Sequence, residues 1–325
     1  MCFLLDPLME RIMDIKERLR EWNGRRYYSL DCFLKKTFRK KLYKLSLNGG
    51  MTCPNRDGTI SSGGCIFCSE GGSGEFALKC TQDIDKQIDA AKALVSRKAD
   101  GSGYIAYFQA FTNTYAPAGR LRELFLPVIS RDDIDVLSIA TRPDCLEDDK
   151  LRLLEELAQI KPVWVELGLQ TIHEESARFI NRGYELPCFD RAVRELKGIG
   201  INVIVHTIVG LPYESLDDMT ATARYVSRSG ADGIKLQLLH VLKGTRLAEL
   251  YEKGLVSTMS EDEYVHAAAV LIGNISPETV IHRLTGDGSR ALLISPKWSG
   301  DKRRVLNRIN HQMKEMDIIQ GSLID

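Results

Sequence analysis

The sequence predicts an α/β protein built as a partial, six-unit (β/α) TIM-like barrel with N- and C-terminal extensions. Short runs of β-branched and apolar residues alternate with stretches in which apolar residues recur every three or four positions. The short runs are apolar on both faces, as is typical of parallel strands that helices cover on each side. Strands that alternate with amphipathic helices in this way favour a parallel barrel or open sheet over an antiparallel sandwich.

Six strands are expected in the core, with amphipathic helices such as those at 84–97 and 149–160 between them. The expected strands lie at 42–48, 104–109, 135–140, 163–168, 202–209 and 233–239. A closed barrel of eight units needs more strands than precede residue 260, so an open barrel of six units fits better. Residues 278–284 are expected to add a strand, and a basic helix is expected near 300–316.

We interpret the chain as an N-terminal helix or tail (1–24), a barrel core (25–260) and a C-terminal extension with the basic helix (261–325). No run approaches the ~18 apolar residues that a membrane span requires. The N-terminus has neither the basic region nor the cleavage site of a signal peptide. A cytoplasmic protein is therefore expected.

Charge is balanced overall, with 44 basic and 44 acidic residues, but it is unevenly distributed. Residues 25–44 hold eight Lys/Arg and one Asp, interleaved with aromatic residues, and residues 297–314 hold six Lys/Arg and one Asp. Basic residues among aromatics suit both phosphate neutralisation and base stacking, so we expect a nucleic acid partner. A plain solvated surface is the alternative. The expected nucleic-acid contacts are Arg25, Arg26, Lys35, Lys36, Arg39, Lys40, Lys41, Lys302, Arg303 and Arg304.

Three cysteines lie close together on a glycine-rich loop, directly after the first expected strand. Cys53, Cys65 and Cys68 have the spacing C-x11-C-x2-C, and in a reducing compartment such a cluster indicates metal ligation rather than a disulfide. One possibility is a structural zinc that recruits Cys80 as its fourth ligand. The other is a 4Fe-4S cluster on three cysteines, which leaves one iron open for chemistry. Gly71, Gly72 and Gly74, which follow the third cysteine, favour the cluster because they let backbone amides approach it.

The position of this loop points to an active site. In parallel β/α folds, chemistry is located in the loops that follow the C-terminal ends of the strands. Here those loops carry the cysteines, "QAFTNTY", "TRPD", "ELGLQT", "GLP" and "LHVLKGT". All the candidate chemistry is therefore expected at one open end of the barrel.

The cysteine loop and the segments that follow the expected strands resemble those of the radical SAM superfamily. The segments "ATRPD", "VELGLQTIHEESARFINRGY" and "VIVHTIVGLPYES" are similar to the catalytic subunit of elongator. The segments "TCPNRDGT", "GGCIFC", "GSGEFA" and "YFQAFTNTYA" are similar to stand-alone bacterial proteins of the MnmL (YtqA) and YhcC type, and this resemblance extends from residue 22 to about 320.

The resemblance implies a site for a 4Fe-4S cluster and S-adenosylmethionine (SAM). Cys53, Cys65 and Cys68 match the cluster ligands of the family. We predict that these three cysteines are also the catalytic residues. Phe67 could pack against the cofactor. The other positions that match SAM contacts are Gln109, Thr112 and Asn113 for the methionine amino group, Thr141 and Arg142 for its carboxylate, Glu166 and Gln170 for the ribose, and Gly210, Leu211 and Pro212 beside the adenine.

The resemblance also implies a reaction. A one-electron donor such as flavodoxin or ferredoxin would reduce the cluster, and cleavage of SAM would yield a 5′-deoxyadenosyl radical. The substrate implied is the wobble uridine of a tRNA anticodon stem-loop, whose 5-carboxymethylaminomethyl side chain on (2-thio)uridine would become 5-aminomethyl. Two alternatives remain: a radical SAM enzyme for a small metabolite or protein side chain, and a non-catalytic, zinc-stabilised RNA-binding module.

Overall fold

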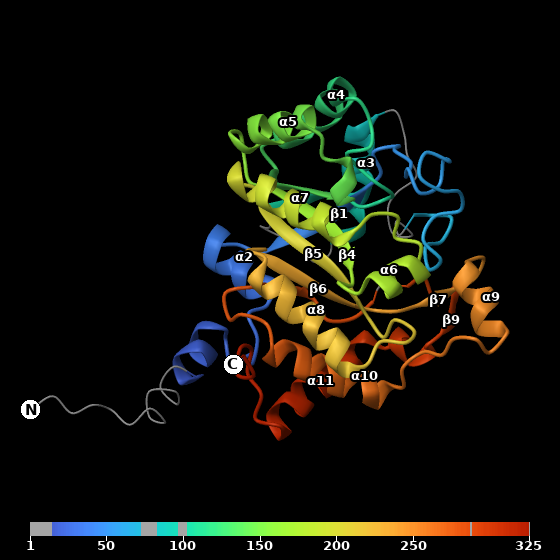
Figure 1. Cartoon of the computed structure of the whole chain (residues 1–325). Coiled ribbons are helices and arrows are strands. Elements are labelled where there is room, and N and C mark those ends of the chain that lie inside the picture. Colours follow the sequence, from blue (N-terminus) through green and yellow to red (C-terminus); the bar gives the residue numbers. More distant parts are fainter. Residues whose placement is uncertain (1–14, 73–82, 97–102, 287, 325) are drawn as a thin grey trace, which may run out of the picture.

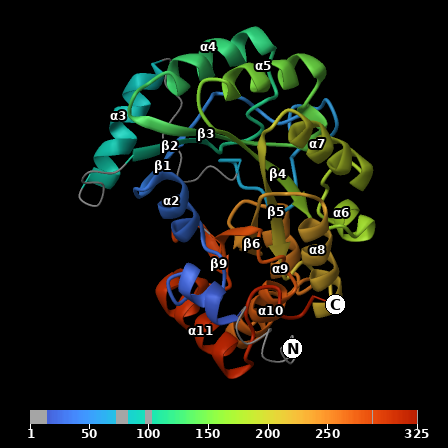
Figure 2. The same ribbon diagram turned by 90° about the vertical axis from the view of Figure 1, so that its left-hand side faces the viewer.

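One parallel sheet curls into a half-barrel (Figures 1 and 2). The computed structural model describes residues 15–72, 83–96, 103–286 and 288–324. In this part of the chain the strands follow one another across the sheet in the order β1-β2-β3-β4-β5-β6-β8. They are β1 (Leu42–Leu47), β2 (Gly103–Phe108), β3 (Ile134–Thr141), β4 (Val163–Gln170), β5 (Asn202–Val209), β6 (Gly233–Leu238) and β8 (Val280–Arg283). The predicted partial barrel and its added seventh strand are confirmed.

Helices cover the outer face of the sheet (Figure 2). They are α3 (Ile84–Val95), α4 (Ala118–Ile129), α5 (Asp148–Ala158), α7 (Leu186–Gly198) and α8 (Leu216–Arg228). A short 3-10 helix η2 (Pro143–Cys145) follows β3, and α6 (Glu174–Phe179) follows β4. The side chains of Asp83 and Ser215 accept hydrogen bonds from the first turns of α3 and α8, and Ser215 completes a capping box with Asp218.

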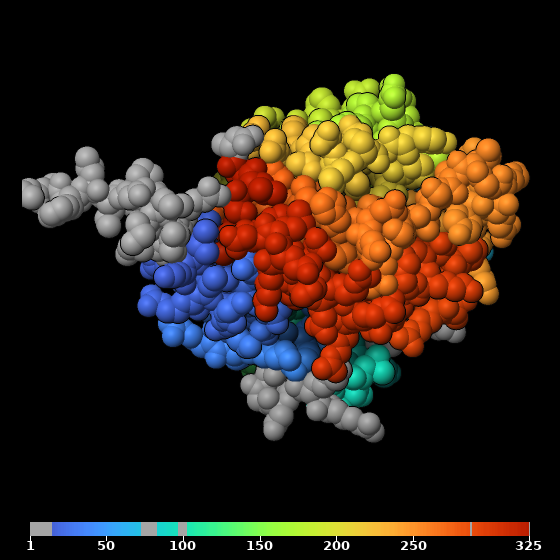
Figure 3. Space-filling model, turned by 90° about the horizontal axis from the view of Figure 1, so that it is seen from below, coloured from blue at the N-terminus to red at the C-terminus, as the bar shows by residue number. Residues whose placement is uncertain are grey.

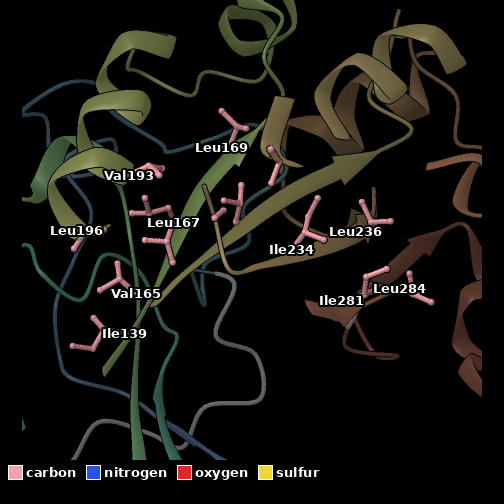
Figure 4. Close-up of a cluster of buried hydrophobic side chains, with 14 of the residues drawn as sticks. Ile139, Val165, Leu167, Leu169, Val193, Leu196, Ile234, Leu236, Ile281 and Leu284 are labelled. Atoms are coloured by element: carbon pink, nitrogen blue, oxygen red, sulfur yellow. The ribbon is translucent and has the colours of Figure 1, made fainter. Parts of the chain in front are cut away.

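Alternating side chains give the sheet two different faces. On β4, Val165, Leu167 and Leu169 point outward and join the main hydrophobic core with Val193 and Leu196 of α7 (Figure 4). The residues between them point into the barrel, because successive side chains of a strand alternate between faces. Glu166, at one of these inward positions, is therefore enclosed by the curled sheet.

The helix α2 (Leu30–Phe38) closes the N-terminal end of the barrel. Its residues Leu34, Phe33 and Phe38 pack in one hydrophobic cluster with inward side chains from the beginnings of the strands. Those strand residues are Leu42, Ile105, Val136, Trp164 and Ile204. The open end, where the cysteine loop lies, is on the opposite side (Figure 1).

The C-terminal residues complete the same core. They form β7 (Val241–Leu242), α9 (Arg246–Glu252), α10 (Glu261–Gly273), β9 (Leu293–Ser295), the 3-10 helix η3 (Lys297–Gly300) and α11 (Lys302–Glu315). The expected basic helix is thus confirmed, and its apolar side chains Val305, Ile309 and Met313 belong to the main core. The division into parts at residues 24 and 260 stays a prediction. No helix in the described part of the chain is long and apolar enough to cross a membrane.

Candidate active site at the open end of the barrel

A cavity of about 450 Å³ opens at the C-terminal ends of the strands. Its volume lies within the range of small-molecule and cofactor sites. All three clustered cysteines, Cys53, Cys65 and Cys68, line it, together with inward residues of β1 to β6. The cysteine loop and four of the five other segments that the sequence placed at one end of the barrel therefore share one site, and the exception is the segment at 210–212.

Hydrogen bonds hold the cysteine loop in place. The backbone amide of Arg56 donates to the carbonyl of Cys53 at 2.8 Å, and that of Cys68 donates to the carbonyl of Cys65 at 2.9 Å. The Arg56 guanidinium donates to the carbonyls of Cys68 and Ser69 and lies over the Phe111 ring. The loop is thus ordered by its own backbone and one arginine.

Asn55 ties the loop to the segment after α6. Its buried amide donates to the carbonyl of Asn181 and lies 3.6 Å from Cys65 Sγ, and the Asn181 amide donates to the Gly64 carbonyl at 2.8 Å. The backbone amide of Ile66 also donates to the carbonyl of Ile180. The second cysteine is therefore positioned by contacts on both of its sides.

The donor set fits an iron–sulfur cluster. Burial, together with the neighbouring Cys68, raises the pKa of the Cys65 thiol to about 12. Without a metal this environment favours the neutral thiol, whereas the positive charge of bound iron would stabilise the thiolate. Within the described ranges, no three Cys, His, Asp or Glu side chains converge as ligands of a single metal ion would. Three cysteine thiols that line one cavity are the ligand set that the 4Fe-4S interpretation requires. Cys80, the fourth ligand of the zinc alternative, lies outside the described residues.

Gly72 provides space for Phe111 beside the cluster loop. It has φ +60°, and a Cβ at this position would overlap the Phe111 ring. We expect Gly72→Ala to lower the free energy of unfolding by about 1–3 kcal/mol more than Gly58→Ala, because overpacking adds to the backbone strain. Gly58 is the matched control, since it also has positive φ but open space around it. Urea unfolding measures both, and equal losses would show that the Phe111 contact does not matter.

The positions predicted to contact SAM divide into two groups. Seven of them line the cavity, namely Phe67, Gln109, Thr112, Thr141, Arg142, Glu166 and Gln170. Four others, namely Asn113, Gly210, Leu211 and Pro212, are not among its lining residues. Asn113 is buried and its amide donates to the carbonyls of Phe108 and Ala140, so it joins the ends of β2 and β3. Gly210 packs against Met259, and a Cβ added at Gly210 would lie only 2.8 Å from the Met259 sulfur.

Arg142 is held by an internal carboxylate. Its guanidinium donates to both oxygens of Asp144, at 2.9 and 2.7 Å, and to the carbonyl of Arg182 at 2.8 Å. It also lies over the ring of Tyr184. A methionine carboxylate bound here would share this guanidinium with Asp144, so the predicted contact stays a proposal.

Glu166 is the centre of a buried polar network inside the barrel. Its carboxylate accepts hydrogen bonds from Lys44 at 2.9 Å, Ser138 at 3.0 Å and His206 at 2.7 Å, and it also pairs with the buried Lys235. Burial by itself would raise the pKa of Glu166, but the charges of Lys235 and Lys44 outweigh it and hold that pKa well below its usual range. Both oxygens thus have protein donors already. Gln170, at the end of β4, is the better placed of the two predicted ribose contacts.

The network extends to residues that the sequence reasoning missed. Tyr107 lies 3.1 Å from Lys235 Nζ, and its ring faces the ammonium groups of both Lys235 and Lys44. Burial and the charge of Lys235 lower the pKa of His206 to about 4, so this ring is neutral near pH 7. One signal was available: a lysine or glutamate in the middle of an otherwise apolar buried strand must face a polar interior.

The two basic segments occupy different places. Lys35 and Lys36 of α2, and Lys40 just after it, lie at the closed end of the barrel and pair with Asp31, Glu21 and Asp135. On α11, Lys302 lines the cavity, whereas Arg304 pairs with Glu261. The first and last described segments of the chain nevertheless lie side by side on one face (Figure 3), where Arg26 donates to the carbonyl of Ile318. The second basic segment therefore reaches the open end through the start of α11, whereas the first reaches the cavity through Lys44 on β1.

Comparison with known proteins identifies the class of protein that this barrel and cysteine loop define. The sequence profile of the radical SAM superfamily matches residues 53–226, and that of the radical SAM C-terminal domain matches residues 231–315. The chain belongs to the radical SAM superfamily. The cofactors of this family are a [4Fe-4S] cluster and SAM, as predicted.

The branch of the family is also as predicted. YtqA of Bacillus subtilis (strain 168) is 46% identical over 297 residues, which cover 91% of this chain and 92% of YtqA. YhcC of Escherichia coli (strain K12) is 36% identical over 90% of this chain and 93% of its own length. Elongator complex protein 3 of Schizosaccharomyces pombe is 29% identical over 53% of this chain and 32% of that protein.

A solved structure supports the fold. The archaeal Methanocaldococcus infernus Elp3 with an N-terminal deletion matches with a TM-score of 0.64, over 86% of this chain and 64% of that one. At 15% sequence identity this likeness concerns the fold alone. It agrees with the half-barrel that the strand order defines.

Proposed function

We propose that this chain modifies the C5 side chain of the tRNA wobble uridine, converting 5-carboxymethylaminomethyl-(2-thio)uridine to 5-aminomethyl-(2-thio)uridine. The observation that carries the proposal is that α11, the basic helix, begins at the wall of the cavity that holds the three cysteines. A polyanion bound along α11 would thus be held next to the site of chemistry.

Cys53, Cys65 and Cys68 would hold the cluster, and the cavity beside them would hold SAM. When bound, these two groups supply a 5′-deoxyadenosyl radical that abstracts a hydrogen atom from an unactivated carbon. The chain's own part is to orient the substrate and to exclude water. Ile208, Leu239 and Phe67 give the cavity the apolar wall that this requires.

The substrate base would have to leave its stack in the anticodon loop to enter a cavity of this size. The wobble position is suited to this, because an unpaired loop base costs the least to turn outward. The carbon of the carboxymethyl group is the proposed site of hydrogen abstraction. With the cluster as acceptor of a second electron from that carbon, addition of water would break its C–N bond, release glyoxylate and leave the aminomethyl group. The similarity of about half of this chain to elongator complex protein 3 agrees with the tRNA substrate that the sequence resemblance implies.

Removing positive charge from α11 is expected to weaken binding of an anticodon stem-loop. For Arg303→Gln, Arg304→Gln and Arg308→Gln combined, we expect about tenfold weaker binding at low salt and a shallower dependence of log K on log salt. The comparison variant carries Lys35→Gln, Lys36→Gln and Lys40→Gln on α2 and just after it, at the closed end of the barrel, and should lose less. Fluorescence anisotropy at several salt concentrations measures both.

Unchanged binding in both variants would exclude these segments as the nucleic-acid surface. The reaction itself is tested by anaerobic reconstitution of the protein with iron, sulfide, SAM and reductant, followed by nucleoside analysis of tRNA carrying the carboxymethylaminomethyl group. Loss of that nucleoside and gain of the aminomethyl one is the expected result. Formation of 5′-deoxyadenosine without any change in tRNA would instead favour a small metabolite or protein substrate.

A further inference from the structure

An exposed tyrosine projects from the loop between β5 and α8. Tyr213 is 79% exposed, which makes it the most exposed of the large hydrophobic residues in the described part of the chain, and the only aromatic one among those that are exposed. It does not line the cavity, so a cofactor bound there would not be its contact. Exposure of a single hydrophobic residue needs no special explanation by itself. At Tyr213 the backbone gives a further reason to ask what the ring does.

The backbone of Tyr213 has a conformation that favours glycine. Pro212 and Tyr213 are the central residues of a tight turn, in which the Glu214 amide donates to the Leu211 carbonyl at 3.2 Å. Tyr213 has φ +70°, and a turn with proline second and a left-handed third residue has the pattern of type II, where glycine is the usual third residue. A tyrosine strains this turn, and its exposed ring offsets little of the strain by burial. Strain of this kind is typical of functional positions.

Neighbouring residues hold the Tyr213 ring in one orientation. Its centroid lies 5.4 Å from that of Phe179, at the end of α6, with an angle of 80° between the two planes. Its hydroxyl lies 3.5 Å from the carbonyl oxygen of Leu255, in the segment after α9. Edge-to-face contact of this type is a favourable aromatic geometry. With 79% of the residue exposed, part of the ring surface stays open to a flat molecule.

This ring lies at the rim of the open end of the barrel. Phe179, which supports it, packs against the hydrophobic cluster that contains Ile66 and Ile208. Phe67 packs against the same cluster, and both Phe67 and Ile208 line the cavity. Figure 1 shows α6 and α9 on the side of the open end. One hydrophobic cluster therefore connects the support of Tyr213 to the cavity wall.

We propose that Tyr213 is a stacking platform for an unpaired RNA base that neighbours the base in the cavity. The inference rests on the proposed function, in which the wobble base turns out of the anticodon loop. Its neighbours in the loop then lose a stacking partner and lie outside the cavity, at its rim. An exposed aromatic ring replaces that partner, and it does so for any base because every base has a flat π face.

The size of the exposed apolar surface favours a base over a protein partner. Ile60, Tyr213 and Leu255 are the exposed large hydrophobic residues in the described loops around the open end. Three side chains provide much less area than the ~800 Å² that each partner contributes to a stable protein interface. Arg178, exposed on α6 next to Phe179 in the sequence, is a cation of the kind that contacts RNA phosphates. A single ring with a nearby cation suits one nucleotide.

Tyr213→Gly is the main variant of the test, because it removes the ring and also relieves the strain of the turn. Its melting temperature is expected within about 3 °C of the wild-type value. We expect it to bind an anticodon stem-loop about tenfold more weakly, the usual effect of losing one base–aromatic stack. Tyr213→Phe should bind like the wild-type protein, since stacking does not use the hydroxyl. Fluorescence anisotropy measures all three affinities.

Further measurements separate stacking from charge and from general apolar contact. The slope of log K against log salt should be unchanged in Tyr213→Gly, because no phosphate contact is lost, whereas the α11 variant makes it shallower. A fully paired RNA duplex of the same length should bind Tyr213→Gly and the wild-type protein equally, because its bases are not available. Leu255→Ala is the matched control, and it should change the affinity for the stem-loop by no more than about twofold.

The other outcomes also decide the question. A stem-loop affinity of Tyr213→Gly equal to that of the wild-type protein would overturn the inference and leave the proposed function intact. Unchanged RNA binding with slower reduction of the cluster by flavodoxin would also overturn it and assign the surface to a protein partner. Equal losses in Tyr213→Gly and Tyr213→Phe would do the same, because the hydroxyl would then be the group that binds.

Nucleoside analysis separates this inference from the proposed function. If stem-loop affinity depends on the ring as expected but the wobble nucleoside of tRNA does not change, the stacking platform stands and the proposed reaction is wrong. If the wild-type protein binds no stem-loop at any salt concentration, both the tRNA substrate and the platform are wrong.

Discussion

Cys65→Ala is expected to abolish binding of the iron–sulfur cluster and all formation of 5′-deoxyadenosine. Cys65 lies between Cys53 and Cys68 in the sequence, and all three line one cavity. Losing one of three protein ligands leaves two, and a cluster held by two thiolates is not retained. After anaerobic reconstitution, the wild-type protein should contain about four irons, and the variant close to none. Iron and sulfide analysis and the absorption spectrum measure this directly.

Cys188→Ala is the control for this experiment. Cys188 is partly exposed on α7 and does not line the cavity, so its replacement should leave the iron content at the wild-type value. Equal iron loss in both variants would mean that the effect is one of general instability. A colourless wild-type protein with one zinc, lost on Cys80→Ala, would instead support the structural zinc site.

Glu166→Gln is expected to lower the free energy of unfolding by about 3–5 kcal/mol at neutral pH. The substitution keeps the size of the side chain but removes the charge that pairs with Lys235 and Lys44. Lys235 is fully buried, so its ammonium group would be left without a compensating charge. Urea unfolding, with the slope checked for two-state behaviour, measures the loss.

Glu166→Gln combined with Lys235→Met is the control. It removes both buried charges at once, and we expect it to recover most of the lost stability, because an apolar replacement of a buried ion pair is often neutral. A double variant that is no more stable than Glu166→Gln would show that the loss does not come from the unpaired lysine.

The pH dependence of the same network has a definite sign. The pKa of Glu166 is lower in the folded protein than its usual value of 4.5. Its contribution to stability is therefore complete above this value and is lost as the pH falls below it towards the folded pKa. The stability difference between the wild type and Glu166→Gln should shrink progressively below about pH 4.5. A difference that grows with acid would contradict the assignment.

Local patterns were sufficient to predict the fold. The apolar runs that became β1 to β6 were expected within one or two residues of their ends, because buried parallel strands have a composition that differs from the helices between them. The cysteine loop and the loops after the strands could be placed at one end of the barrel for a similar reason: the carboxyl ends of parallel strands meet there.

Contacts between distant residues could not be predicted in the same way. Lys44 meets Glu166 across 122 positions, and Lys235 meets it across 69. Which inward side chains become neighbours depends on how far the sheet curls, and that curl is set by packing over the whole barrel.

The basic segments show the same limit at the surface. Their composition indicated two similar polyanion-binding segments, but the apolar side of α2 packs into the closed end of the barrel while α11 begins at the open end. By itself the sequence determined the chemistry available: three thiols on one loop and strands that bring their ends together. Only the tertiary structure decided which charges face the cavity, because charge and hydrophobic pattern are local properties, whereas the direction a segment faces depends on everything packed against it.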